Sequence, residues 1–521
     1  MINNFQNKKF RPRRNAFNDP SRKTTKNIIA LQDGDIYSGN VKITRKVQPG
    51  PVIFSVSDGY GNVDAVIKNC DFKVGDVVNI SGTVNKRAGK LQIELDDIKK
   101  SDADLDSIIE ENSKPTNTKF SIESKRFEKL RPYFYKIAKR IRKAVLENQP
   151  ITIRHHADSD GINAGMTIEQ SCKMFMEKIG INPEFNLYRS PSRTPFYDIT
   201  DVLRDVVLIK RIIEGHGQKK PIIIVLDNGS SYEDIFGLKA LKSLGFEIIV
   251  IDHHNPVIIQ NKKTLVDPYI SFHLNPYIEG LDSQTCTGML AYEVARWICE
   301  EYSNPVLPAV AGLSDRCVVE ELDKYIKNSG KTKKELEEIG TAIDFVAYHL
   351  KFNAGKGLFE TLYENHELVE IIDEEVRKGV ETQLETTLPY LRTQNLNGVV
   401  LSTIDLEKYT MRFSYPNPGK VVGMIHDAVA IGKERLPVMT LGYLVDSVII
   451  RATKPILPVQ TIIDRIKKDI PYSHIEGGGH ERAGTIKFTP AHLNSILENI
   501  KQQIRELNYS NTLQEASPEQ T

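Results

Sequence analysis

The sequence has little cysteine and no long apolar run. Its five cysteines among 521 residues show no paired spacing, so neither a disulfide framework nor a zinc site built on thiolates is indicated. No apolar stretch approaches the roughly 20 residues that cross a bilayer, and the first residues are too polar and charged for a signal peptide. We therefore expect a cytoplasmic protein without a membrane-spanning segment.

A large net charge and several common enzyme motifs are also missing. The formal net charge is +1, so affinity for nucleic acid would have to come from local clusters of charge. One such region is residues 1–29, where lysine and arginine greatly outnumber acids. This flexible basic arm can contact phosphates, dock a partner or stay solvated. Nothing resembles a nucleophile elbow, a P-loop or a Rossmann glycine fingerprint.

What the sequence does contain is a set of carboxylates and imidazoles directly after three apolar runs. The runs are residues 150–153, 221–226 and 246–251, and the groups that follow them are His156, Asp158 and Asp160, then Asp227, then Asp252, His253 and His254. Such runs are typical of central strands in a parallel sheet, where reactive groups gather at the carboxyl ends. Because strands alternate with helical patterns over residues 149–318, we predict a doubly wound α/β domain there.

Carboxylates that meet at one edge of a sheet repel one another unless a cation neutralises them. A lone aspartate after a strand is more often a turn former or a helix cap, but the joint pattern favours a metal site. Oxygen and imidazole ligands without thiolate suit two divalent ions, with Mn²⁺ favoured and Mg²⁺ as the alternative. Two such ions activate water for attack on phosphorus. The sequence thus predicts hydrolysis of phosphodiesters.

These residues, in this order, resemble the DHH phosphoesterase superfamily, and specifically its RecJ-like exonuclease branch in the archaeal form with an amino-terminal OB-fold. Residues 311–315, which end in Asp315, and residues 477–484 are similar to two further motifs of the family. The match extends over residues 148–490. It implies a DHH catalytic domain over residues 149–318 and a smaller α/β DHH-associated domain, which binds substrate, over residues 396–490.

The resemblance also implies how the ligands divide between two ions. One ion would be held by His156 and Asp158, the other by Asp160, His253 and Asp315, and Asp227 would bridge both. RecJ itself usually has aspartate where this chain has His156, so the ligands of the first ion depart from the family pattern.

Catalytic and substrate-binding positions are implied as well. His254 would donate a hydrogen bond to a phosphoryl oxygen, and Asp252 would orient an imidazole, so both are catalytic positions together with Asp227. In the DHH-associated domain, the implied substrate-binding residues are Gly478, Gly479, His480 and Arg451. For Arg451 a salt bridge is an equal alternative.

Residues 30–100 carry a second signal, because apolar and polar positions alternate there between closely spaced turns. The expected strands are residues 35–43, 52–58, 63–67, 76–84 and 91–95, which predict a small closed barrel. Residues 54–67 and 75–98 resemble the nucleic-acid-binding OB-fold, which binds single strands through a basic groove and stacked aromatics. Tyr60, on a glycine turn, is the predicted stacking residue, with Lys42, Arg45 and Lys46 around the groove.

The rest of the chain completes a multidomain organisation. Residues 101–148 are expected to form a linker and a helix, residues 319–395 a helical connector, and residues 491–521 a carboxyl-terminal helix with a frayed tail. Residues 189–195 are expected to form a surface turn or, as the alternative, to bind the strand.

Together these features predict a metal-dependent exonuclease that is specific for single strands of DNA, RNA or both, with replication or repair proteins as further candidate partners. Three alternatives stay open. The enzyme can act on short oligonucleotides or cyclic dinucleotides, it can be a replication or RNA-processing scaffold with weak catalysis, or it can hydrolyse pyrophosphate or short polyphosphate. A strand-binding barrel would be superfluous for the last of these.

Overall fold

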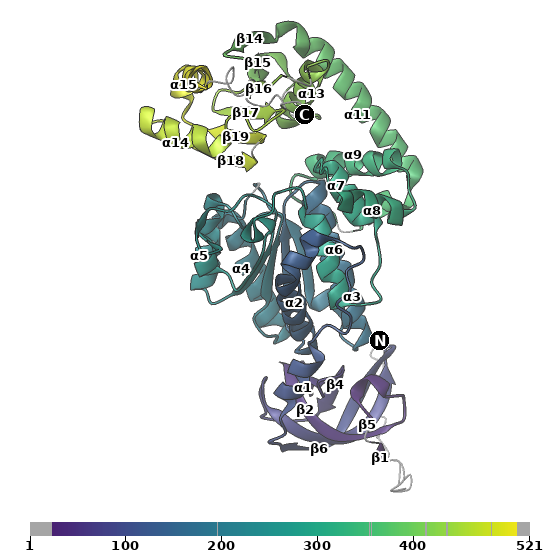
Figure 1. Cartoon of the computed structure of the whole chain (residues 1–521). Helices are drawn as coiled ribbons and strands as arrows, with labels where there is room; N and C mark the ends of the chain where they lie inside the picture. Colours follow the sequence, from purple (N-terminus) through teal and green to yellow (C-terminus); the bar gives the residue numbers. More distant parts are fainter. Residues whose placement is uncertain are drawn as a thin grey trace, which may run out of the picture.

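The computed structural model describes residues 23–507, apart from residues 25, 195, 354, 356, 412, 413, 434, 435 and 481. Figure 1 shows a barrel at one end, an α/β domain in the middle and a second α/β domain at the other end, with the long helix α11 (His366–Thr387) leading into the last. Most of the predicted basic arm, residues 1–29, and the predicted frayed tail lie outside the described residues.

The barrel domain comprises residues 36–100. Its strands are β2 (Ile36–Val47), β3 (Val52–Ser57), β4 (Asn62–Ile67), β5 (Val77–Arg87) and β6 (Lys90–Lys100), with the short β1 (Lys23–Thr24) beside β2. They close in the order β2-β3-β4-β6-β5-β2, antiparallel except for β4 and β6. Alternate side chains, such as Phe54 and Ile80, fill the interior and are fully buried. The predicted closed, OB-like barrel is therefore confirmed.

The middle domain, residues 125–314, is built on a parallel sheet. Its strands are β7 (Ile151–His155), β8 (Leu187–Pro191), β9 (Ile222–Leu226), β10 (Glu247–Ile251) and β13 (Phe272–Leu274), in the order β13-β10-β9-β7-β8. Ile222 and Ile224 belong to one core and Ile223 and Val225 to another. A sheet that is buried on both faces explains the continuous apolar runs, and it confirms the predicted parallel α/β sheet.

Helices cover both faces of this sheet (Figure 1). One core contains residues of α2 (Lys125–Leu146), α3 (Ser159–Lys178), α6 (Thr287–Ile298) and α7 (Val306–Ser314), and the other contains residues of α4 (Ile199–His216) and α5 (Ile235–Ser243). Smaller elements complete the domain: α1 (Leu105–Asn112) precedes it, and a hairpin of β11 (Ile258–Gln260) and β12 (Lys263–Thr264) follows β10. The chain order reverses between β7 and β9, so the carboxyl ends of these strands form the switch point at which sheets of this kind bind ligands.

A connector of helices leads to the carboxyl-terminal domain. It consists of α8 (Glu320–Ser329), α9 (Lys333–Leu350), α10 (Leu358–Glu364) and α11. The domain beyond it has a mixed sheet in the order β14 (Arg392–Leu396), β15 (Val399–Asp405), β16 (Val438–Tyr443), β17 (Ser447–Ala452), β19 (Ala483–Lys487) and β18 (Glu476–His480). Helices α12 (Leu406–Tyr409) and α13 (Pro418–Ala430) pack on one core, and α14 (Val459–Asp469) and α15 (Leu493–Glu506) on the other. Among the described helices none combines the length and apolarity that crossing a bilayer requires.

The barrel and the carboxyl-terminal domain contact opposite ends of the middle sheet (Figure 1). In the barrel, the Asn62 amide donates to Ile179 O at 2.7 Å and the Lys46 amide to Gly217 O at 3.4 Å, near the amino ends of the middle strands. At the other end, Arg316 pairs with Asp427 of α13. The barrel therefore lies away from the carboxyl ends of the strands, where the candidate site is expected.

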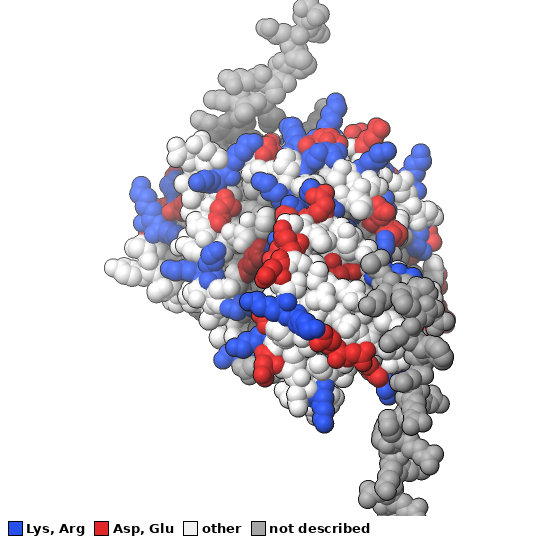
Figure 2. Space-filling model, turned by 90° about the horizontal axis from the view of Figure 1, so that it is seen from below, with Lys and Arg blue, Asp and Glu red and all other residues white. Residues whose placement is uncertain are grey.

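Three of the cations that were predicted around a basic groove of the barrel have partners within the protein. The Arg45 guanidinium donates to His216 O at 2.8 Å, Lys46 donates to the carbonyls of Cys70 and Phe72, and Lys42 pairs with Asp106 of α1. These cations hold the barrel together and against its neighbours. Figure 2 shows basic and acidic side chains interspersed on the face that the barrel end presents in this view.

Candidate metal centre

The residues after β7 begin the site. Asp158 is the N-cap of α3, and its carboxylate accepts a hydrogen bond from the Gly161 amide at 3.0 Å. Gly161 permits a tight turn, because a Cβ there would lie 2.5 Å from His156 O. The turn brings His156 and Asp158 together, with 2.8 Å between His156 Nδ1 and Asp158 Oδ2.

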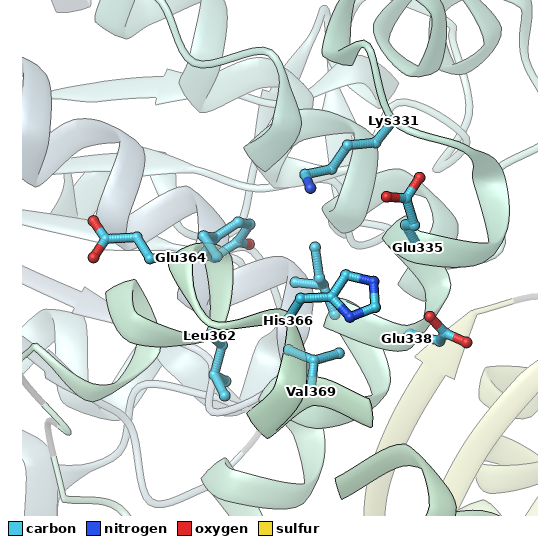
Figure 3. A pocket seen from close by; sticks show the side chains of 9 residues that line it. Lys331, Glu335, Glu338, Leu362, Glu364, His366 and Val369 are labelled. Atoms are coloured by element: carbon cyan, nitrogen blue, oxygen red, sulfur yellow. The ribbon is translucent and has the colours of Figure 1, made fainter. Parts of the chain in front are cut away.

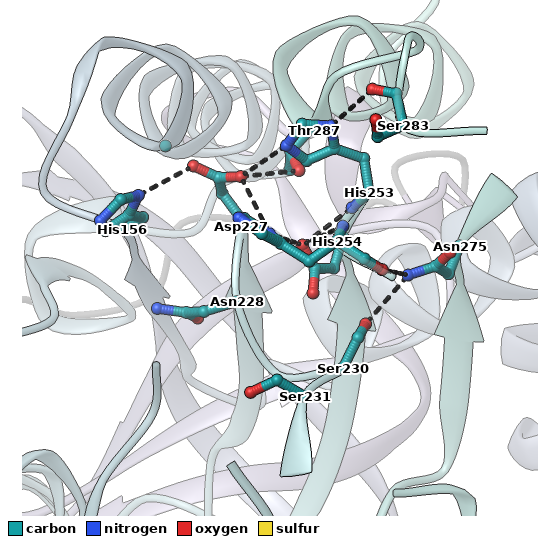
Figure 4. A network of polar contacts seen from close by, with 12 residues as sticks. His156, Asp227, Asn228, Ser230, Ser231, His253, His254, Asn275, Ser283 and Thr287 are labelled. Carbon is teal, nitrogen blue, oxygen red and sulfur yellow. Dashed lines mark hydrogen bonds and ion pairs between the residues drawn. The ribbon is translucent and has the colours of Figure 1, made fainter. Parts of the chain in front are cut away.

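Asp227, directly after β9, lies at the centre of the site (Figure 4). Its φ of 58° is a left-handed conformation that is uncommon for a residue with a side chain and occurs at functional sites. The buried carboxylate places Oδ2 3.4 Å from His156 Nδ1 and Oδ1 3.3 Å from His253 Nε2. Thr287 Oγ1 also donates to Oδ1, at 3.2 Å. Asp227 thus connects the end of β7 with the end of β10.

Two groups of possible ligands share Asp227. One is His156, Asp158 and Asp227, the other is Asp227, His253 and His254, and within each group the nitrogen and oxygen atoms lie within 4.8 Å of one another. The shared position agrees with the bridging role predicted for Asp227, although the roles themselves stay predictions.

Asp160 and Asp315 lie next to His253 but outside these two compact groups. Asp160 Oδ2 is 3.8 Å from His253 Nε2, and Asp315 Oδ2 is 3.7 Å from His253 Nδ1, which also contacts Ser283 O at 2.8 Å. The carboxylate of Asp160 accepts the amides of Thr287 and Gly288 at the start of α6. The structure therefore gathers all six predicted ligands in one place, and it also groups His254, which was predicted to face the substrate, with Asp227 and His253.

Asp252 contacts both histidines through its carboxylate. It is fully buried, and its Oδ1 accepts the His253 amide at 2.8 Å and lies 2.7 Å from His254 Nδ1. This contact holds the His254 ring, as expected of a residue that orients an imidazole.

The charges at the site perturb one another strongly. Burial by itself would lower the pKa of His156 and His253, but adjacent carboxylates, Asp158 for His156 and Asp315 for His253, outweigh it and raise both well above 6.5. Burial raises the pKa of Asp160 well above its usual range and that of Asp315 to about 6. Without a cation, protons on the carboxylates or on the neighbouring histidines therefore offset the negative charge of the site.

This chemistry fits divalent metal ions. The side chains offer carboxylate oxygens and imidazole nitrogens, which suit Mn²⁺ and Mg²⁺. Asp160 and Asp227 are buried, and the more exposed Asp158 and Asp315 add further negative charge beside the same histidines, so a divalent cation would relieve the repulsion among these carboxylates.

The glycine motif of the carboxyl-terminal domain forms the edge strand β18. A Cβ at Gly477 or Gly479 would lie 2.2 Å from Thr485 O or 2.3 Å from Ala483 O, so the pairing with β19 requires glycine. A Cβ at Gly478 would lie 3.8 Å from the Glu233 carboxylate of the middle domain. The strand thus borders the loop that follows β9 and carries Asp227. The side chain of His480 is not among those that the structure describes.

Arg451 and Tyr60 lie in very different places. Arg451, on β17, donates to Ile450 O at 3.0 Å, and burial followed by the charge of Arg316 lowers the pKa of its guanidinium. Arg451 therefore lies on the side of the carboxyl-terminal domain that faces the middle domain. Tyr60 is 43% exposed on the turn between β3 and β4, at the barrel end and away from the metal centre.

Sequence reasoning missed several residues that shape the site. Thr287 and Gly288 start α6 under Asp160, and Asp344 accepts the Ser159 amide at 2.9 Å between two predicted ligands. A threonine and glycine at the start of a helical pattern were a usable signal for Thr287, whereas nothing local marks Asp344. The surface turn expected at residues 189–195 was wrong at its start, because residues 189–191 belong to β8 and Arg189 is 7% exposed and pairs with Glu169.

A separate cavity lies on the connector (Figure 3). It measures about 110 Å³ and is lined by side chains that include Lys331, Glu335, Glu338 and His366. Glu338 pairs with Lys334 and His366 with Glu370, so partners on the helices compensate these charges. The metal centre is not part of this cavity.

A doubly wound domain with carboxylates and imidazoles gathered at its switch point has the architecture of α/β proteins that bind ligands at that position. Residues 150–314 match the model of the DHH family, N-terminal domain. An uncharacterized protein of Methanocaldococcus jannaschii is 34% identical over 516 residues, covering 89% of this chain and 68% of that protein. The chain therefore belongs to the DHH family, which confirms the predicted resemblance.

Solved structures are similar as well. A DHH domain from a protein described as a member of a family of ribosomal proteins is 35% identical with a TM-score of 0.74, covering 77% of this chain and 97% of that one. RecJ from Thermus thermophilus, in complex with Mn²⁺, is 14% identical with a TM-score of 0.49, covering 76% and 57%. The family assignment rests on the family model and the two proteins of higher identity.

Proposed function

We propose that the protein is a metal-dependent exonuclease that hydrolyses phosphodiester bonds of single-stranded DNA or RNA. One observation carries the proposal: Asp227, at the switch point of the sheet, is shared by two compact groups of carboxylates and imidazoles. Clefts at the carboxyl ends of strands are where α/β proteins bind ligands.

The side chains have distinct tasks in this proposal. His156, Asp158 and Asp227 would hold one divalent ion, and Asp227, Asp160, His253 and Asp315 the other, with Mn²⁺ as the preferred metal. Two such ions supply an activated water and compensate charge on the reacting phosphate. His254, held by Asp252, would donate a hydrogen bond to a phosphoryl oxygen.

The carboxyl-terminal domain would bind the strand. Its bare backbone at Gly478 and Gly479 borders the loop after β9, so a terminal nucleotide could approach closely there. Arg451 offers a guanidinium whose one hydrogen bond within the described residues goes to a neighbouring carbonyl. His480 is proposed as a further contact on the motif alone.

A second candidate function has its own support. The barrel contacts the opposite end of the middle domain from the metal centre, so a short substrate would engage the centre and the glycine strand without reaching the barrel. Hydrolysis of oligonucleotides or cyclic dinucleotides is therefore the alternative. A replication or RNA-processing scaffold with weak catalysis is disfavoured, because the set of predicted ligands is complete.

The test compares long and short substrates under controlled metal. Labelled single strands of DNA and RNA of about 20 nucleotides, the matching duplex, a dinucleotide and a cyclic dinucleotide are incubated with Mn²⁺, Mg²⁺ or chelator. The exonuclease predicts stepwise shortening of the single strands, no cleavage with chelator and no cleavage of the duplex. Preferential cleavage of the dinucleotide would favour the alternative.

Matched variants separate this activity from a contaminant. Asp315→Ala removes a predicted ligand, whereas Asp323→Ala makes the same change on the exposed surface of α8. We expect Asp315→Ala to lose nearly all activity and Asp323→Ala to keep it. Equal activity in both variants would contradict the ligand assignment.

A further inference from the structure

Ser230, His273 and Asp267 lie in a hydrogen-bonded row beside the metal centre. Ser230 Oγ is 2.9 Å from His273 Nε2, and His273 Nδ1 is 3.1 Å from Asp267 Oδ1. The order serine, histidine, aspartate is that of a hydrolase triad. Ser230, however, is 1% exposed, and its oxygen accepts Asn275 Nδ2 at 3.1 Å, so it is not available as a nucleophile.

The row ends on the loop that carries His254. Asn275 Nδ2, which donates to Ser230, also donates to His254 O at 2.9 Å (Figure 4). The Asp252 amide donates to Leu274 O at 3.0 Å. Residues at the end of β13 therefore hold the segment from Asp252 to His254 at both of its ends.

One arrangement of protons satisfies every contact in the row. Asp267 Oδ2 accepts the Thr264 amide at 2.8 Å, so Oδ1 is left to accept His273 Nδ1–H. His273 Nε2 then accepts the Ser230 hydroxyl, and the Ser230 oxygen accepts Asn275. In this arrangement every donor of the row has an acceptor, and hydrogen-bond networks that are fully satisfied are rigid.

We propose that Asp267, His273, Ser230 and Asn275 are positioning residues that fix the His254 loop for the reaction. The inference rests on the proposed function, because it assumes that His254 contacts the substrate. Groups that orient a catalytic or metal-binding side chain are typically worth about 10- to 100-fold when they are removed. None of the four is needed as a ligand in the proposed metal centre.

Asp267→Asn is the sharpest test, because Asp267 is about one third exposed at its side chain and far along the row from His254. Asparagine has one acceptor oxygen where aspartate receives two donors. If the amide nitrogen of the new asparagine faces His273, then His273 Nδ1 must accept and the ring proton moves to Nε2. The Ser230 oxygen then faces two donors, His273 Nε2–H and Asn275 Nδ2. Ser230→Ala removes the middle of the row directly. Asp323→Asn and Ser243→Ala are the matched controls at exposed positions.

Each full-length variant is compared with the wild type in three measurements: kcat and KM on a labelled single strand, Mn²⁺ affinity by calorimetry, and hydrogen exchange of residues 252–255. We expect kcat to fall by about 10- to 100-fold in Asp267→Asn and Ser230→Ala. KM and Mn²⁺ affinity should stay at wild-type values, while the loop amides exchange faster. Ser230→Thr, which keeps a hydroxyl, should recover part of kcat.

Other outcomes overturn the inference in recognisable ways. Wild-type kcat and exchange in both variants would show that the row does not position the loop. Loss of Mn²⁺ binding in step with kcat would show that the row supports the metal ligands instead. If the wild type cleaves no nucleic acid, the proposed function fails, and the exchange measurement still decides whether the row holds the loop.

Discussion

Asp227 and His253 are in contact at the carboxyl ends of two neighbouring strands, with 3.3 Å between Asp227 Oδ1 and His253 Nε2, although they lie 26 positions apart in the chain. The contact exists because β9 and β10 are parallel neighbours in register, with Leu226 opposite Ile251. Each residue follows its strand by one or two positions, so the pairing of the strands brings the two side chains together.

Asp227→Asn should therefore disable the whole centre rather than one half. The variant keeps the shape of the side chain but removes the charge shared by both ligand groups. We expect hydrolysis to fall by more than about 100-fold and calorimetry to show loss of both Mn²⁺ sites. Asp158→Asn, which lies in one group only, should leave one site measurable. Retention of two sites in Asp227→Asn would contradict the shared role.

Binding of Mn²⁺ should release protons and strengthen as pH rises. The carboxylates beside His156 and His253 hold the pKa of each imidazole well above 6.5, against the effect of burial, so both carry protons in the metal-free protein near neutral pH. A divalent ion must displace these protons, and higher pH removes them in advance. Calorimetry in buffers of different ionisation enthalpy measures the release. An affinity that is constant between about pH 6 and 8 would contradict the argument.

The sequence was sufficient to predict the sheet and the position of the site. Continuous apolar runs before Asp227 and His253 indicated buried parallel strands, and parallel strands place their following residues at one edge. The order of the strands was not predictable, because it depends on long-range packing between residues such as Ile224 and the helices on either face.

The supporting contacts were harder to predict for the same reason. Asp344 reaches Ser159 across 185 residues, and Asn275 reaches His254 from another strand end, without any local pattern. The misjudged cations of the barrel have a related cause. Arg45 alternates like a groove residue, but the docking of the barrel on the middle domain turns it toward His216 O.

Gly288→Ala should damage the metal centre without removing a ligand. A Cβ at Gly288 would lie 2.4 Å from the Ala311 Cβ and 2.9 Å from Asp160 Oδ1. The start of α6 must then shift, and Asp160 loses the amide at 2.8 Å that it accepts from Gly288. We expect a lower melting temperature and weaker Mn²⁺ binding. Gly330→Ala, at an open position with a left-handed φ, should lower stability alone.

Two ion pairs that join the carboxyl-terminal domain to the rest of the protein should contribute differently to stability. Arg316 and Asp427 are largely exposed, so Asp427→Asn should cost at most about 0.5 kcal/mol. Asp344 is mostly buried, pairs with Lys420 and also accepts the Ser159 amide. Asparagine keeps an acceptor oxygen but not the charge, so the hydrogen bonds from Lys420 and Ser159 are weakened, and Asp344→Asn should cost about 1–3 kcal/mol. Urea unfolding of both variants measures the difference, and equal costs would contradict it.

Tyr60→Ala should weaken binding of long single strands and spare short substrates. Tyr60 is 43% exposed on the turn between β3 and β4. The barrel contacts the end of the middle domain that lies opposite the metal centre, so we expect only a long strand to reach both. Stacking of one base contributes about 1–3 kcal/mol, which predicts a Kd about 5- to 150-fold weaker for a 20-mer. Tyr60→Phe keeps the ring and should bind like the wild type. Fluorescence anisotropy gives the affinities, and kcat on a dinucleotide should be unchanged in both variants. If Tyr60→Ala binds the 20-mer as tightly as Tyr60→Phe does, the ring does not stack on a base, and the barrel must contact the strand elsewhere or serve another partner.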